Sequence, residues 1–173
     1  FNSPDSMDFY LTDASVFSTL LGGWIWEDTS EFHIYNDKAV LEQMKVNNNQ
    51  QVIVLEGSIG NTVNDTLRTS VSELNLNNIT SFVGLNNEDF KVNGFVNAEL
   101  ELSSLLSDIE LLSEIKLNEV EVNSYSIGEF NFNSNWDKEK NRFIISGGLL
   151  NENREEELII KYFYIYPEND QYN

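Results

Sequence analysis

The chain contains no cysteine among its 173 residues. This absence excludes disulfide bonds, thiolate zinc sites and cysteine nucleophiles. His33 is the single histidine, so a zinc site would depend on carboxylate ligands. Proline is scarce, with 2 residues, and asparagine-rich segments take its place between apolar stretches. This composition is typical of strands joined by polar turns.

Basic residues are also few, since 10 Lys and Arg stand against 29 Asp and Glu, a net charge of −19. We expect no nucleic-acid partner, because phosphate recognition requires a basic surface. The same charge disfavours electrostatic docking on an anionic membrane surface. The sequence also lacks the roughly 18 consecutive apolar residues of a membrane helix. Its longest such run, "VFSTLLGGWIW", is interrupted by two glycines.

Alternation of apolar and polar residues fills most of the chain. In "FVNAELEL", residues 95–102, Val96, Leu100 and Leu102 share one parity with Ala98, and polar residues take the other. The stretch "SIGEFNFNSNWDKEKNRFIISGGLL", residues 126–150, reads as two strands around a charged turn. Roughly ten such segments follow one another at short spacing, which predicts an all-β fold.

Local signals refine this expectation. "VIVLEGSIG" is apolar on both parities from Val52 to Leu55, which indicates a strand covered on both faces. "GNTVND", residues 60–65, is typical of a hairpin loop. The alternation changes phase at Asn118–Glu119, which predicts a bulge. Gly147 and Gly148 indicate a place where the sheet needs relief from crowding.

Two segments favour short helices instead. "ELNLNNITSFVGL", residues 73–85, has apolar residues at helical spacing, and a second helix is expected near Ser15 to Leu21. A sub-boundary is conceivable at residues 84–94, where the helical patch gives way to strands. We otherwise expect residues 1–173 to form one β-rich section.

The sequence offers little that resembles a catalytic centre. His33 stands near Glu27, Asp28, Glu31 and Asp37, but these acids lack the spacing of a calcium loop, so we expect a strand histidine and no metal site. No G-x-S-x-G elbow or phosphate-binding glycine loop is present. Pairs of carboxylates for glycoside cleavage are inevitable by chance among so many acids. We therefore predict no catalytic residues, no cofactor and no enzymatic activity.

The aromatic row Phe130, Phe132 and Trp136 has two interpretations. It can line a core or an apolar groove, or it can form an exposed platform that stacks on sugars. The first interpretation suits a lipid-holding sheet, and the second suits a closed binding module with exposed aromatics at one end.

Several segments resemble one protein family. "GGWIWEDTSEFHIYNDKAVLEQMKVNNNQQVIVLEGSIGNTVNDTL" is similar to a section of the translocation and assembly module TamB proteins, AsmA-like proteins of Bacteroidetes-type bacteria. "LNLNNITSFVGLNNEDFKVNGFVNAELELSS" and "LNEVEVNSYSIGEFNFNSNWDKEKNRFIISGGL" resemble the units that follow it in that family. The chain departs from the family pattern in its acidity and in the absence of a proline near Ser107.

The resemblance implies a curved antiparallel or mixed sheet folded into an elongated trough, a β-taco, with one or two short helices. It implies a periplasmic section of a cell-envelope protein that is anchored in the inner membrane and takes part in phospholipid transport or outer-membrane biogenesis. The implied partners are phospholipid acyl chains and an Omp85-type outer-membrane barrel, with edge-to-edge self-association of the isolated section. The residues expected to line the hydrophobic groove are Val96, Leu100, Leu102, Phe130, Phe132, Trp136, Phe143 and Ile145.

Two alternatives stay open at this point. One is an extracytoplasmic β-sandwich that binds glycans or proteins, which requires two packed sheets. The other is a hydrolase with paired carboxylates, for which the abundance of acids provides the opportunity but no motif.

Overall fold

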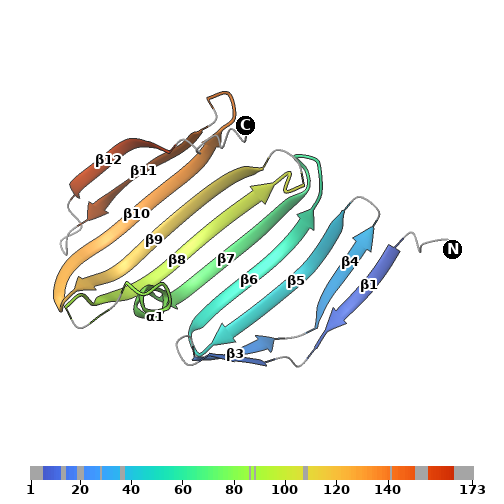
Figure 1. The fold of residues 1–173 in the computed structure, drawn as a ribbon, viewed down its shortest axis with the longest axis horizontal. Helices are drawn as coiled ribbons and strands as arrows, with labels where there is room; N and C mark the ends of the chain where they lie inside the picture. Colours follow the sequence, from blue (N-terminus) through green and yellow to red (C-terminus); the bar gives the residue numbers. More distant parts are fainter. Residues whose placement is uncertain are drawn as a thin grey trace, which may run out of the picture.

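The computed structural model describes residues 6–12, 15–18, 22–27, 29–35, 38–85, 87, 89–106, 109–140, 142–150 and 156–165. They form an open, curved sheet of twelve strands with one short helix on it (Figure 1). The strands are β1 (Ser6–Leu11), β2 (Ser15–Ser18), β3 (Gly22–Glu27), β4 (Ser30–Tyr35), β5 (Ala39–Asn48), β6 (Gln51–Ile59), β7 (Thr66–Asn75), β8 (Val92–Ser103), β9 (Glu110–Val122), β10 (Tyr125–Asp137), β11 (Arg142–Leu150) and β12 (Glu156–Ile165). The helix is α1 (Leu76–Phe82).

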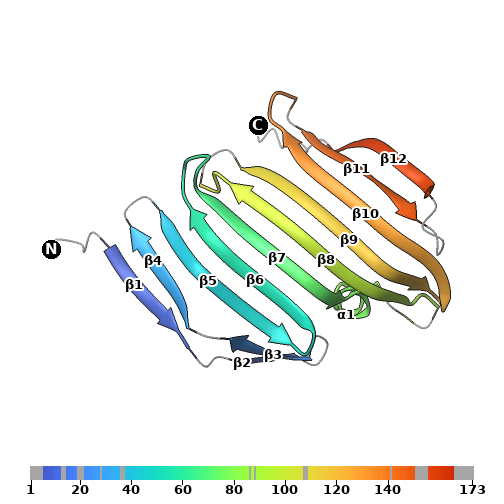
Figure 2. The same cartoon turned by 180° about the vertical axis from the view of Figure 1, so that it is seen from behind.

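The strands from β4 to β12 follow one another through the sheet as an antiparallel meander, and β1 pairs with β4 at one edge. The strand β5 pairs with β6 on one side and is long enough to pair with two strands on the other. Its first half pairs with β4, and its second half pairs with β3, which in turn pairs with β2 (Figure 2). The prediction of an all-β fold built on a curved antiparallel sheet is therefore confirmed.

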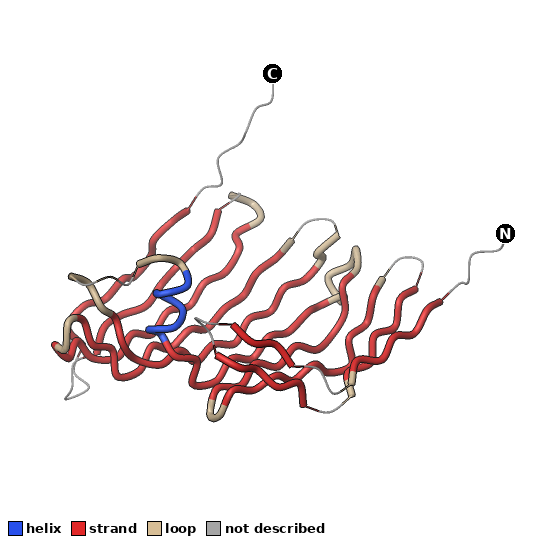
Figure 3. Tube along the Cα trace, turned by 60° about the horizontal axis from the view of Figure 1, so that its bottom comes forward, coloured by secondary structure: helices blue, strands red, loops and turns tan. Residues whose placement is uncertain are grey.

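The described strands form one layer and not the two packed sheets of a β-sandwich. Figure 3 shows the sheet from near its edge, with α1 lying against one face. Within the described part of the chain, α1 packs on β8. The expectation that Val52 to Leu55 is covered on both faces is wrong, because these side chains are half-buried by their neighbours within the sheet.

The helix expected within residues 73–85 is confirmed as α1. The Asn75 side chain caps its first turn by accepting a hydrogen bond from the backbone N–H of Asn78 at 3.2 Å. The second expected helix is wrong where the structure describes it, since residues 15–18 form β2 and pair with β3. Pairing of all four residues with β3 outweighed the helical spacing of the apolar residues in this segment. Residues 19–21 lie outside the described part.

The bulge predicted at Asn118–Glu119 is confirmed. Phe95 of β8 lies opposite Asn118, whereas Asn93 lies opposite Glu121, so β9 carries an extra residue. Gly94 faces this bulge with a φ of 132°. A Cβ at this position would lie 2.8 Å from the Asn118 carbonyl oxygen, which explains why glycine stands there.

The predicted hairpin loop at residues 60–65 joins β6 to β7, and Asp65 organises it. Its Oδ2 accepts hydrogen bonds from the Thr62 hydroxyl at 2.7 Å and from the Thr62 backbone N–H at 3.0 Å. These two bonds, with smaller help from Lys38 and Ser58, hold the pKa of the Asp65 carboxyl below its usual range. The Asp65 carbonyl accepts a hydrogen bond from the N–H of Ser104, at 3.2 Å, and so ties this turn to the end of β8.

Residues 84–94 do not interrupt the sheet. They follow α1 and lead into β8, and β7 and β8 on either side of them pair directly. The two halves of the chain thus share one sheet.

Candidate functional site: an apolar face of the sheet

One face of the sheet is apolar from edge to edge. In an antiparallel sheet, the side chains of two residues directly opposite one another point to the same face. Partners can therefore be followed from strand to strand, and together they form a row of side chains on one face. The longest such row runs from β3 to β12, over roughly 40 Å at 4.8 Å per strand. It consists of Trp26, Val46, Ile53, Val71, Ala98, Ile115, Phe132, Gly147 and Ile160.

Neighbouring rows extend the same face on both sides of this one. The row towards one end of the strands contains Met44, Leu55, Thr69, Leu100, Ser113, Ser134 and Ile145. Beyond it lie Phe9, Phe32, Leu41, Gly57, Leu67, Leu102 and Leu111. On the other side lie Leu74, Val96, Leu117, Phe130, Leu149 and Leu158. We call the surface made by these rows, together with Trp136 and Phe143, the apolar face.

All eight residues predicted to line a groove lie on the apolar face, on the three strands β8, β10 and β11. They come together in two groups. Val96 and Phe130 lie on either side of Leu117, and Phe132 follows in the next row. Leu100, Leu102, Ile145, Trp136 and Phe143 lie towards the opposite strand ends. The structure thus places these side chains on a common surface.

The aromatic side chains of this surface contact one another. The rings of Phe130 and Phe132 stack with centroids 5.9 Å apart, and those of Trp136 and Phe143 pack at 4.6 Å with a tilt of 56°. Phe132 lies across from Gly147, and a Cβ there would come within 2.9 Å of its Cδ1. The glycine relieves crowding, as its position in the sequence predicts.

The apolar face is covered only in part. Ala98 and Val120 are the apolar side chains that are buried among the described residues, at 8% and 4% exposure. Most other side chains of the face are half-buried because they shield one another, whereas Phe9 of β1 and Leu158 of β12, near the two edges, are 47% and 51% exposed. Contiguous apolar surface of this extent marks a site of interaction with lipid or protein.

Polar atoms on the apolar face are satisfied locally. Ser113 and Ser134 lie opposite each other, and their hydroxyls are hydrogen-bonded at 2.7 Å. The two hydroxyls already share a hydrogen bond, so covering them with an apolar ligand costs less than covering two hydroxyls that have no partner.

The opposite face carries most of the charge. Arg68 pairs with Glu101 at 2.9 Å, and Lys116 pairs with Glu114 at 2.8 Å, a hydrogen bond that raises the pKa of Lys116. A hollow of about 570 Å³ lies here over β8–β11. Its lining combines the acids Glu99, Glu101 and Glu114 and the amides of Asn133 and Asn135 with the apolar side chains of Leu112 and Ile144. The three carboxylates would have to lose water if hydrocarbon covered them. This hollow was not predicted, since alternation assigns a residue to a face but says nothing of the shape of that face.

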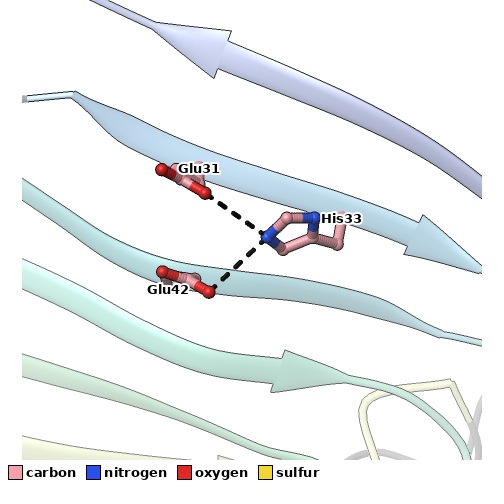
Figure 4. Close-up of side chains that lie close together, drawn as sticks. All are labelled: Glu31, His33 and Glu42. Atoms are coloured by element: carbon pink, nitrogen blue, oxygen red, sulfur yellow. Dashed lines mark ion pairs between the residues drawn. The ribbon is translucent and has the colours of Figure 1, made fainter.

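His33 also lies on this polar face, as a half-buried residue of β4. Of the acids near it in sequence, Glu31 lies beside its ring and Glu27 pairs with Lys45 of β5 instead. Asp28 and Asp37 lie outside the described residues. Sequence reasoning missed Glu42 and Asp8, which reach His33 from the two strands that flank β4 (Figure 4 shows Glu31, His33 and Glu42).

Two further findings bear on function. In the part of the chain that the structure describes, no helix has the length and apolar character needed to cross a membrane. Comparison with models of protein families, with curated proteins and with solved structures gives no match.

Proposed function

We propose that the chain is a non-enzymatic section of a longer cell-envelope protein, whose apolar face holds the acyl chains of phospholipids as they move between membranes. The observation that supports this most strongly is the unbroken row from Trp26 to Ile160, which crosses the strands of the sheet. An acyl chain lying along such a row meets hydrocarbon at every strand it passes.

The energetics suit transport. Removing a CH₂ group from water contributes about 0.8 kcal/mol, so a chain of many such groups is held firmly even by partial contact. Apart from the small, buried Ala98, the side chains of the row are half-buried, so no position offers a lipid a deep pocket. A lipid can therefore shift from one strand to the next without leaving a deep pocket. The charged opposite face keeps the sheet in water.

The edges of the sheet support a continuation into a longer structure. In the described part, β1 pairs with β4 alone and β12 with β11 alone, so each has a free side. Such edges tend to pair with further strands. A neighbouring section of the same protein would extend the apolar face by the same register rule. The periplasmic location, the inner-membrane anchor, the role in outer-membrane protein assembly and the Omp85-type partner rest on the sequence resemblance.

The direct test is chemical analysis of the purified chain. We expect organic extraction followed by mass spectrometry to recover phospholipid from protein produced in a bacterial envelope, in an amount comparable to the protein. A lipid-free chain that also fails to take up added phospholipid would contradict the proposal. The glycan-binding alternative would instead give a lipid-free protein that binds oligosaccharides.

A further inference from the structure

The surroundings of His33 bring together side chains from three adjacent strands. Its Nε2 lies 3.7 Å from Glu31 Oε2 on the same strand and 3.6 Å from Glu42 Oε1 on β5 (Figure 4). Its Nδ1 lies 2.8 Å from Asp8 Oδ1 on β1. One ring nitrogen is therefore hydrogen-bonded, and the other faces two carboxylates.

The two longer distances are close to those between ligands of a common ion. They exceed the 2.7–3.2 Å of an ordinary N–H···O hydrogen bond. Zinc binds imidazole nitrogen and carboxylate oxygen at about 2.0–2.2 Å, so two ligand atoms at a tetrahedral angle stand roughly 3.3–3.6 Å apart. The ligand atoms of Glu31, His33 and Glu42 all lie within 4.8 Å of one another. Slight adjustment of the exposed Glu42 side chain would complete the set.

Asp8 supplies the outer partner that metal-binding histidines usually have. A hydrogen bond from Nδ1–H to a carboxylate fixes the tautomer and leaves the Nε2 lone pair free to bind a metal. The Asp8 bond reaches His33 from β1, directly across from it in the register. The ring is thus oriented with Nε2 towards Glu31 and Glu42.

The carboxylates around the His33 ring would be stabilised by a cation. Phe32 lies opposite Leu41, which puts Glu31 and Glu42 at neighbouring positions of two paired strands, where like charges repel. Within the described residues, His33 is the basic side chain found near both, and it carries a positive charge only when protonated. The hydrogen bond to Asp8, and then the charges of Asp8, Glu42 and Glu31, raise the pKa of His33. A proton or a metal ion on Nε2 would each relieve this repulsion.

We propose that Glu31, His33 and Glu42 bind a zinc ion, with Asp8 as a positioning residue and water completing the coordination. Imidazole with carboxylates suits zinc among the divalent ions, and the chain has no thiolate to compete. The ion would join β4 to β5, and β1 through Asp8, at the edge where the sheet starts. The site lies on the polar face, so it does not depend on the acyl-chain function.

Calorimetric titration with zinc chloride, on the tag-free chain, tests the site. We expect one tight equivalent for the wild type, a loss of at least about tenfold in affinity for His33→Gln and Glu42→Gln, and about tenfold for Asp8→Asn. Glu114→Gln is the matched control, because Glu114 lies on the same face beside a cation and far from His33 in the sheet. Equal affinities for the wild type and His33→Gln would overturn the proposal.

A second readout needs no variant. His33 is the only histidine, so its imidazole C–H signals are assigned in the proton NMR spectrum by residue type alone. One equivalent of zinc is expected to shift them and to halt their titration with pH. Signals that titrate unchanged in the presence of one equivalent of zinc would overturn the site even if the variants fold poorly.

Discussion

Replacing Phe132 by Asp is expected to remove phospholipid from the purified chain. Phe132 lies in the middle of the longest apolar row, between Ile115 of β9 and Gly147 of β11. A carboxylate there would have to lose its water wherever an acyl chain crosses it, a cost of several kcal/mol. We expect recovered phospholipid to fall by at least about tenfold, which corresponds to 1.4 kcal/mol.

Asn133→Asp is the matched control, because it adds the same charge one residue further along β10. Asn133 faces the other side of the sheet, where it lines the acidic hollow. We expect this variant to keep its lipid, and both variants to keep the β-sheet signal in circular dichroism. An equal loss of lipid in both would mean that net charge, and not the apolar face, governs binding.

Gly147→Ala is expected to destabilise the sheet strongly. A Cβ at residue 147 would overlap the Asn131 carbonyl oxygen and press on the Phe132 ring. The strands β10 and β11 would have to separate locally, with a loss of about 3 kcal/mol in the free energy of unfolding. Urea denaturation monitored by tryptophan fluorescence measures this.

Ser146→Ala is the control for that experiment, since it changes the preceding residue on the opposite face. Ser146 lies on the wall of the acidic hollow. Its loss is expected to change the free energy of unfolding by less than about 0.5 kcal/mol. If Gly147→Ala unfolded at the same urea concentration as Ser146→Ala, the close approach of β11 to β10 would be contradicted.

The faces of the sheet could be predicted from the sequence because the side-chain period of a strand is two. Once Phe130, Phe132 and Trp136 are assigned to a strand, they must share a face. Short hairpin connections such as residues 60–65 then pair successive strands and set their register. The phase change at Asn118–Glu119 could be read for the same reason, since an extra residue is the simplest way to reverse a period of two.

Other features depend on pairing between distant segments. Glu42 lies close to His33 only because Leu41 pairs with Phe32. No local sequence pattern predicts this register. The apolar residues Val52 to Leu55 resemble a strand buried between two layers, yet they lie in a single layer whose neighbouring strands leave them half-buried. Residues 15–18 form a strand because they pair with β3, although their apolar residues have the spacing of a helix. Tertiary pairing outweighs local preference in each case.

The central claim is that acyl chains lie on the apolar face, and photo-crosslinking along β10 tests it most directly. A photoreactive amino acid placed in turn at residues 130–135 alternates between the two faces, because Phe130, Phe132 and Ser134 face one side and Asn131, Asn133 and Asn135 the other. Lipid bound to the apolar face gives crosslinks to phospholipid at the even positions and background at the odd ones. Crosslinks of equal strength at both sets, or stronger ones at the odd positions, would contradict the assignment of the lipid to this face.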